Sequence, residues 1–206
     1  MVDPTAHPSG LFDLTGRIAC VTGASAGLGR RTASVLARAG ASVVGVARRK
    51  EALDDWQRET DGATHAVAAD LSDRDGLGAR ADAVRSAFGP PDIVVHAAGL
   101  NPREAAGDVT DAGWDATLAL NLTTPFFLSQ QFAPDMLGKG GGRIVTFAAL
   151  QTTRAFPGGV AYGASKAGIA QLTRAMAGAW KTGGVNGKGS GAGVWRAELA
   201  EREVAD

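Results

Sequence analysis

The sequence predicts a single α/β domain built on a doubly wound parallel sheet with strand order 3-2-1-4-5-6. Short runs rich in Val and Ile alternate along the chain with segments of helical length. A glycine-rich loop directly follows the first of these runs, as it does in sheets of this kind. The length of 206 residues lets one domain bury a sizeable core.

The apolar runs are strand candidates because their apolar residues are consecutive, which is typical of parallel strands covered on both faces. The segments between them are long enough to form the helical crossovers that parallel strands need. The predicted strands are Arg17–Thr22, Ser42–Ala47, Thr64–Ala69, Asp92–Ala97 and Arg143–Phe147, and the predicted helices are Leu28–Ala39, Lys50–Thr60, Asp73–Phe88, Asp111–Leu137 and Val160–Lys181.

The C-terminal part breaks this alternation. Gly183–Gly193 holds six glycines in eleven residues, and glycine weakens the interior of a strand. Read alone, this stretch would be a flexible linker. As the sixth strand, at the edge of the sheet, it is expected to show weak or absent strand pairing around Val185–Ser190. A polar helical stretch, Arg196–Ala205, follows it.

The composition argues against several classes of function. Lys plus Arg and Asp plus Glu both number 21, so no net charge favours nucleic acid or an anionic membrane. The first residues lack the pattern of a signal peptide, and no apolar run approaches the ~18 residues of a membrane span. The single cysteine, Cys20, has no metal-site spacing and is interpreted as a buried strand residue. A cytoplasmic protein is expected.

The glycine-rich loop has the features of a phosphate cradle. Its glycines allow a tight turn and a close approach of the backbone to a pyrophosphate, and the helix that follows offers free N–H groups to the anion. A plain strand–helix turn is the alternative, but the position after the first strand favours a dinucleotide site and a Rossmann-like fold. The residues expected to bind are Gly23, Ser25, Ala26, Gly27, Leu28 and Gly29. Residues 16–195 are assigned to this domain, 1–15 to an N-terminal extension and 196–206 to a C-terminal tail.

The end of the second predicted strand indicates which dinucleotide binds. Folds that prefer NAD place an acid there for the ribose 2′-hydroxyl, whereas this chain has Arg48 and Arg49. A guanidinium can hold a 2′-phosphate through two hydrogen bonds. Arg48 is assigned this role, supported by Arg30 or Arg49, and a solvated basic helix start is the alternative. NADP(H) is therefore favoured over NAD(H).

Tyr162 and Lys166 form the candidate catalytic pair. Their spacing of four places phenol and ammonium on one face of a helix. A phenol, with a pKa of about 10, is a poor acid–base group at neutral pH unless a nearby cation stabilises its phenolate. Lys166 supplies that cation.

These motifs together resemble the short-chain dehydrogenase/reductase family, from Leu11 to about Leu199. The resemblance implies that Tyr162 is the acid–base, that Lys166 activates it and binds the nicotinamide ribose, and that Asn121 holds a relay water. It also implies cofactor contacts, which involve Asp70 and Leu71 near adenine, Ala98 and Gly99 near its ribose, and Gly193. Asp70 could alternatively cap the next helix. A homodimer through Asp111–Leu137 and Val160–Lys181 is left open.

The chain also departs from the family pattern. The serine expected thirteen residues before the tyrosine is Ala149, and the nearest hydroxyls belong to Thr146 and Thr152. His96 replaces a structural asparagine and is interpreted as structural too. After the sixth strand, Ala197 stands where the family has a threonine that contacts the cofactor carboxamide, and the family's seventh strand is expected to be missing.

The predicted function is an oxidoreductase that transfers a hydride between NADP(H) and a small-molecule carbonyl or secondary alcohol. The alternatives are a catalytically impaired nucleotide-binding homologue with a regulatory or partner role, and a chain without function. Asn101–Glu104 and Leu150–Gln151 resemble a bacterial branch that includes gluconate-type dehydrogenases. Within it, Arg103 is interpreted as a partner of a substrate carboxylate or of a loop salt bridge.

Overall fold

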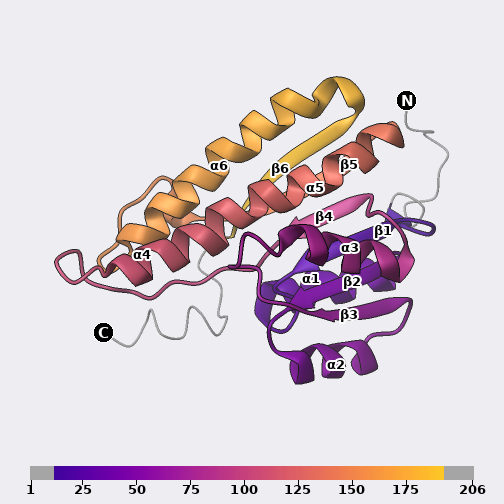
Figure 1. Cartoon of the computed structure of the whole chain (residues 1–206), viewed down its shortest axis with the longest axis horizontal. Coiled ribbons are helices and arrows are strands. Elements are labelled where there is room, and N and C mark those ends of the chain that lie inside the picture. The colour runs from indigo at the N-terminus through magenta and orange to yellow at the C-terminus, as the bar shows by residue number, and fades with distance from the viewer. Residues whose placement is uncertain (1–11, 193–206) are drawn as a thin grey trace.

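A computed structural model describes residues 12–192, which form one six-stranded parallel sheet in the order β3-β2-β1-β4-β5-β6 (Figure 1). The expected fold and strand order are confirmed. The strands are β1 (Ile18–Thr22), β2 (Ser42–Ala47), β3 (Thr64–Ala68), β4 (Ile93–His96), β5 (Gly142–Ala149) and β6 (Val185–Ala192). The α-helices are α1 (Gly27–Arg38), α2 (Lys50–Glu59), α3 (Leu77–Phe88), α4 (Asp111–Leu118), α5 (Thr124–Gly138) and α6 (Val160–Trp180), with a π-helical turn η2 (Ala119–Thr123) and two 3₁₀ turns, η3 (Leu150–Thr152) and η4 (Lys181–Gly183).

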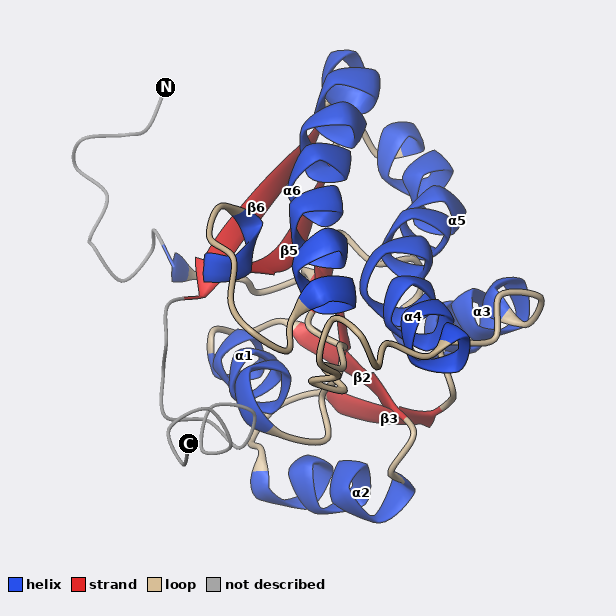
Figure 2. Ribbon diagram, turned by 90° about the vertical axis from the view of Figure 1, so that its left-hand side faces the viewer, coloured by secondary structure: helices blue, strands red, loops and turns tan. Residues whose placement is uncertain are grey.

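Helices cover both faces of the sheet and create two cores (Figure 2). In β1, Ala19 and Val21 belong to the core beneath α1 and α2, whereas Cys20 belongs to the core beneath α3 and α5. All three side chains are fully buried, which explains why the strand is a continuous apolar run. Burial raises the pKa of the Cys20 thiol to about 12, as expected for a packed strand residue.

Two predicted helices differ from the structure. The third begins at Leu77, four residues later than expected, because the polar residues before it form turns. The long helix expected over Asp111–Leu137 is divided into α4 and α5 by η2. Within residues 12–192, no helix is long and apolar enough to cross a membrane.

The expected weak or absent strand pairing in the glycine-rich C-terminal stretch is wrong, because this stretch forms β6. Each of its eight residues is paired in parallel with a residue of β5, including the stretch Val185–Ser190. The close approach of α6 favours glycine at position 187, since a Cβ there would lie 3.1 Å from the carbonyl oxygen of Thr173, a tight contact. Gly187 therefore reflects close helix–strand packing rather than a linker.

Two of these glycines provide a test of the strand. Both line a cavity of about 500 Å³ between α6 and β6, but a Cβ on Gly189 would meet no heavy atom closer than 3.7 Å. Gly189→Ala should therefore stabilise the fold by roughly 0.5–1 kcal/mol, because alanine restricts the unfolded chain. The matched change Gly187→Ala should give no gain, because it crowds Thr173 and Ala177. Urea unfolding of both variants is the measurement, and equal stabilities would argue against β6.

Candidate active site

The glycine-rich loop has two packed glycines and one open glycine. Gly23 is left-handed with φ of 73°, and a Cβ there would lie 2.8 Å from the backbone nitrogen of Ala98. A Cβ on Gly29 would lie 2.3 Å from the carbonyl oxygen of Gly23. Gly27, with φ of 52°, has no heavy atom within 4 Å of its Cβ position. The loop therefore packs tightly against β4 and stays open at Gly27, where a ligand's phosphate could approach the backbone.

The first turn of α1 begins in this open part. Ala26 occupies the N-cap position and provides no side-chain hydrogen bond, and the first turn contains no acidic residue. The N–H groups at the helix start therefore have no side-chain cap, and the positive end of the helix dipole is not neutralised. Leu28, in the same turn, keeps 41% of its side chain exposed beside the loop. This arrangement suits an anion such as a pyrophosphate.

The arginines after β2 lie near this loop. Arg49 donates a hydrogen bond of 3.3 Å from Nη2 to the hydroxyl oxygen of Ser25, and Arg48 is exposed at the strand end. Arg30 instead donates to the carbonyl oxygen of Ala52 and to Glu59. The structure thus brings Arg49 and Ser25 together, while the guanidinium of Arg30 bonds to α2.

Asp70 does not cap the next helix. Its Oδ1 accepts hydrogen bonds from the backbone N–H and the hydroxyl of Ser72, and α3 starts later, with Gly76 at its N-cap. The Ser72 bonds lower the pKa of Asp70, and the positive charge of Arg48 contributes to the same shift. The carboxylate is exposed after β3, and Leu71 beside it is buried, its carbonyl oxygen accepting from Thr124. The capping alternative for Asp70 is therefore wrong.

Asn121 connects the end of β4 to α6. Its Oδ1 accepts from the N–H of Leu100 at 2.9 Å, and its Nδ2 donates to the carbonyl oxygen of Leu100 and to Ser165. A Cβ on Gly99 would lie 3.1 Å from this Oδ1 and 4.0 Å from Nζ of Lys166. The predicted residues Gly99, Asn121 and Lys166 therefore lie together. Asn121 sits in the π turn η2, an irregularity that is frequent at functional sites.

The Tyr162–Lys166 pair lies in the first two turns of α6. Nζ of Lys166 is 5.4 Å from the centroid of the Tyr162 ring and donates a hydrogen bond of 2.6 Å to the carbonyl oxygen of Phe147 in β5. The lysine is 7% exposed, and its burial lowers its pKa to about 8. At neutral pH it therefore remains a cation beside the phenol.

The missing serine hydroxyl is not replaced by a neighbour. Thr146 forms a buried contact of 2.8 Å with the hydroxyl of Thr173, on the face covered by α6. The hydroxyl of Thr152 accepts from the N–H of Ala149 and donates to the carbonyl oxygen of Lys166. Both threonines therefore have intramolecular partners, and Ala149 leaves the end of β5 without a hydroxyl.

His96 is buried at the end of β4, where Nε2 lies 2.8 Å from the hydroxyl of Ser129. Its Nδ1 is buried without a hydrogen-bond partner among residues 12–192. Burial lowers the pKa of His96 to about 4, so the ring is neutral in the folded protein near pH 7. These features fit the structural role expected for it.

The His96 burial predicts a loss of stability in acid. Between pH 6.5 and about 4 the unfolded chain binds a proton that the folded protein does not, so stability falls as the pH decreases. From pH 7 to pH 4.5 this group should remove about 2 kcal/mol. Urea unfolding at several pH values should show that His96→Asn, which cannot titrate, loses less over this range. Parallel pH profiles for both proteins would contradict the burial of a neutral imidazole.

Comparison with known proteins identifies the family of the chain. A family model described as short chain dehydrogenase matches residues 17–206. The chain belongs to the short-chain dehydrogenase family. Gluconate 5-dehydrogenase from Gluconobacter oxydans (strain 621H) is 36% identical over 204 residues, which is 98% of this chain and 79% of that enzyme.

Two crystal structures of family members are also similar. A gluconate 5-dehydrogenase from Burkholderia cenocepacia J2315, in complex with NADP and tartrate, has a TM-score of 0.89 at 29% identity and covers 97% of this chain and 80% of its own. A protein from Beutenbergia cavernae described as a putative NAD(P)-dependent gluconate 5-dehydrogenase, with NADP at low occupancy, has a TM-score of 0.87 at 36% identity, covering 95% and 79%. The resemblance to gluconate-type dehydrogenases is thereby supported.

Several features of the site were not predicted. The Phe147 carbonyl that holds Lys166 is a backbone group, which no sequence motif marks. The hydroxyl of Thr22 accepts from the N–H groups of both Ala97 and Ala98, and so joins the glycine-rich loop to the end of β4. Arg103 alone among non-glycine residues 12–192 has a left-handed backbone, with φ of 58°. Gly193, Ala197 and Arg196–Ala205 lie outside the described residues.

Proposed function

We propose that this short-chain dehydrogenase is an NADP-dependent oxidoreductase that acts on a carbonyl or secondary alcohol. The observation that carries the proposal is the buried Lys166 cation, 5.4 Å from the Tyr162 ring and close to Gly99 and Asn121. A phenol next to a desolvated ammonium is suited to proton transfer near neutral pH. The family supports this class of reaction.

The residues present fit a dinucleotide with a 2′-phosphate. The open backbone at Gly27 and the uncapped start of α1 suit the pyrophosphate. Arg48, with Arg49 and Ser25 beside it, would hold the 2′-phosphate, because guanidinium groups bind phosphate through paired donors. Of the other predicted contacts, Asp70 and Leu71 would flank adenine, whereas Ala98 and Gly99 would leave room for its ribose.

When bound, NADPH supplies the hydride for carbonyl reduction. Tyr162 gives its phenolic proton to the substrate oxygen, and it takes a proton back when an alcohol is oxidised. Lys166 stabilises the phenolate by its charge and is proposed to bind the nicotinamide ribose. Asn121 bonds the segment after β4 to α6, which keeps Tyr162 and Lys166 in a fixed position relative to the end of β4.

The cofactor assignment predicts that NADPH binds at least about tenfold more tightly than NADH, a difference of about 1.4 kcal/mol. Arg48→Ala should remove most of this preference, because the guanidinium is proposed to bind the 2′-phosphate, which NADH lacks. Arg58→Ala is the matched control, since this α2 arginine bonds to Asp54 and Asp55 of its own helix. Fluorescence titration measures both cofactors, and equal affinities in the unmodified protein would refute the assignment.

The second candidate is a nucleotide-binding homologue with impaired catalysis and a regulatory or partner role. Ala149 favours it, because the position at the end of β5 has no hydroxyl of its own, and those of Thr146 and Thr152 bond to other groups of the protein. Cofactor binding without turnover on a panel of carbonyl compounds would support this candidate. Gluconate and other polyhydroxylated compounds come first in that panel, since gluconate 5-dehydrogenases are among the relatives. We also propose a cytoplasmic protein that forms a homodimer through Asp111–Leu137, which covers α4 and α5, and Val160–Lys181, which covers α6; light scattering tests the dimer.

A further inference from the structure

The proposed 2′-phosphate site is divided between two elements whose relative position is set elsewhere. Ser25 precedes α1, whereas Arg48 and Arg49 precede α2. The contact of 3.3 Å between Arg49 and Ser25 therefore depends on how α2 is docked against α1. A side chain that is remote from this contact can change it by moving one helix relative to the other.

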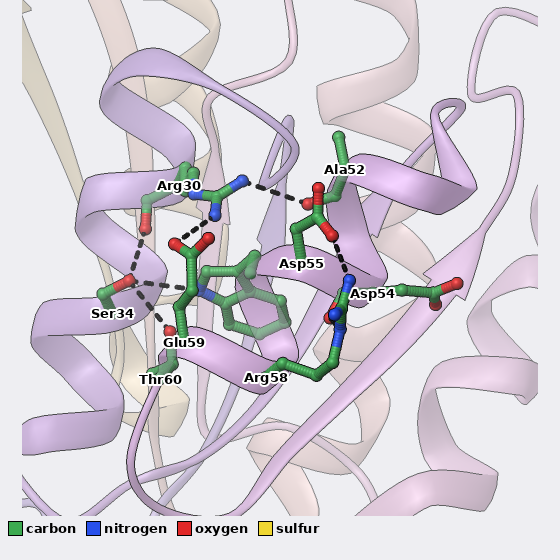
Figure 3. Close-up of polar contacts among 9 residues, drawn as sticks. Arg30, Ser34, Ala52, Asp54, Asp55, Arg58, Glu59 and Thr60 are labelled. Carbon is green, nitrogen blue, oxygen red and sulfur yellow. Dashed lines mark hydrogen bonds and ion pairs between the residues drawn. The ribbon is translucent and has the colours of Figure 1, made fainter.

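Arg30 joins the two helices directly (Figure 3). It follows Gly29 in the first turn of α1, and its Nη1 donates a hydrogen bond of 3.1 Å to the carbonyl oxygen of Ala52, in the first turn of α2. Its Nη2 forms an ion pair of 2.6 Å with Glu59, the last residue of α2. One planar guanidinium thus bonds to both ends of α2, a geometry that a single ammonium cannot reproduce.

A second row of contacts lies beneath this one. The indole N–H of Trp56 in α2 donates to the hydroxyl of Ser34 in α1 at 3.2 Å, and this hydroxyl also lies 3.2 Å from that of Thr60 (Figure 3). Ser34 in turn donates to the carbonyl oxygen of Arg30. The two rows share a side of α1, so they hold α2 along its length.

The same tryptophan links α2 to the glycine-rich loop. Trp56 is fully buried, and a Cβ on Gly45 of β2 would lie 2.6 Å from its ring and 3.0 Å from the Cβ of Ala24. The indole and Ala24 thus flank the same point of β2. A shift of α2 would therefore change the packing of Trp56 beside Ala24, in the glycine-rich loop that is part of the proposed phosphate site.

We propose that Arg30 is a positioning residue for cofactor choice. By bridging Ala52 and Glu59, it fixes the start of α2 against the glycine-rich loop and holds Arg48 and Arg49 at the 2′-phosphate. The proposal rests on the NADP function above and extends it, because Arg30 acts through α2 and need not touch the cofactor. Its effect should therefore appear in the ratio of NADPH to NADH affinity, whereas a general loss of stability would weaken both cofactors alike.

Two substitutions distinguish positioning from charge. Arg30→Lys keeps the positive charge but loses the planar guanidinium that bonds to Ala52 and Glu59 together. It should weaken NADPH binding about three- to tenfold, while NADH affinity changes less than about twofold. Glu59→Ala removes the carboxylate that pairs with the Arg30 guanidinium and should also lower the preference for NADPH over NADH. If Arg30 acted on the phosphate only by its charge, Arg30→Lys would be neutral, and Glu59→Ala would increase NADPH affinity because a nearby negative charge is lost.

The experiment is fluorescence titration of the full chain and its variants with NADPH and NADH, with Arg58→Lys as the control for an arginine confined to α2. Thermal unfolding of each variant identifies any that fails to fold, and Glu59→Ala then provides the test, because Glu59 is largely exposed. A lower NADPH-to-NADH ratio in both variants supports the proposal. An unchanged ratio, or a higher one in Glu59→Ala, overturns it. The absence of any NADPH preference in the unmodified protein would instead refute the NADP assignment.

Discussion

Ala149→Ser is expected to raise the rate of carbonyl reduction at least about tenfold. The loss of one preorganised hydrogen-bond donor from a catalytic site typically costs on the order of 10²–10³ in rate, and tenfold is the cautious end of that range. The hydroxyls of Thr146 and Thr152 do not compensate, because Thr146 is bonded to Thr173 and Thr152 to the backbone of Lys166. A serine at position 149 would restore a donor at the end of β5.

The control for this gain is Ala148→Ser, one residue earlier in β5. Residues two apart in a strand share a face, so a hydroxyl at position 148 would point the same way as that of Thr146, into the packing against the middle of α6 and away from the face of Ala149, and should give no gain. Cofactor affinity should change little in either variant. Steady-state NADPH oxidation is the measurement. If Ala149→Ser binds NADPH but gains nothing, the missing hydroxyl is not what limits this protein.

Tyr162→Phe is expected to lower the rate by about 10²–10⁴, the usual contribution of a positioned acid–base group. The substitution keeps the ring beside Lys166 and removes only the phenolic hydroxyl, so NADPH affinity should stay within about twofold. It should also abolish the gain from Ala149→Ser, because a serine can orient the carbonyl but cannot replace the proton donor. Activity equal to that of the unmodified protein would exclude Tyr162 as the acid.

The fold could be predicted where burial and close packing determine the residue types of a segment. β1 is apolar at consecutive positions because both of its faces are covered, and Gly23 and Gly29 stand where backbone atoms nearly touch. The full pairing of β6 with β5 could not be predicted, because it rests on tertiary contacts, and Gly187 is explained only by the proximity of Thr173 in α6. Local propensity indicates a linker there, and tertiary packing overrides it.

The site was predictable to a similar degree. Tyr162 and Lys166 are marked by their helical spacing, and the structure places them side by side at the start of α6. What the sequence could not show is the network around them. The carbonyl oxygen of Phe147 that binds Lys166 and the π turn that carries Asn121 depend on backbone geometry, which residue types do not specify.

The most direct test of the proposed function is the transfer of deuterium from NADPH labelled at the transferable position of its nicotinamide ring. The unmodified protein is incubated with labelled NADPH and a panel of carbonyl compounds, led by the keto forms of polyhydroxy acids, and the products are analysed by mass spectrometry. An alcohol that carries the label on its former carbonyl carbon, and that does not form with Tyr162→Phe, is the expected result. NADPH that binds but leaves every compound unlabelled would contradict the assignment of an active oxidoreductase.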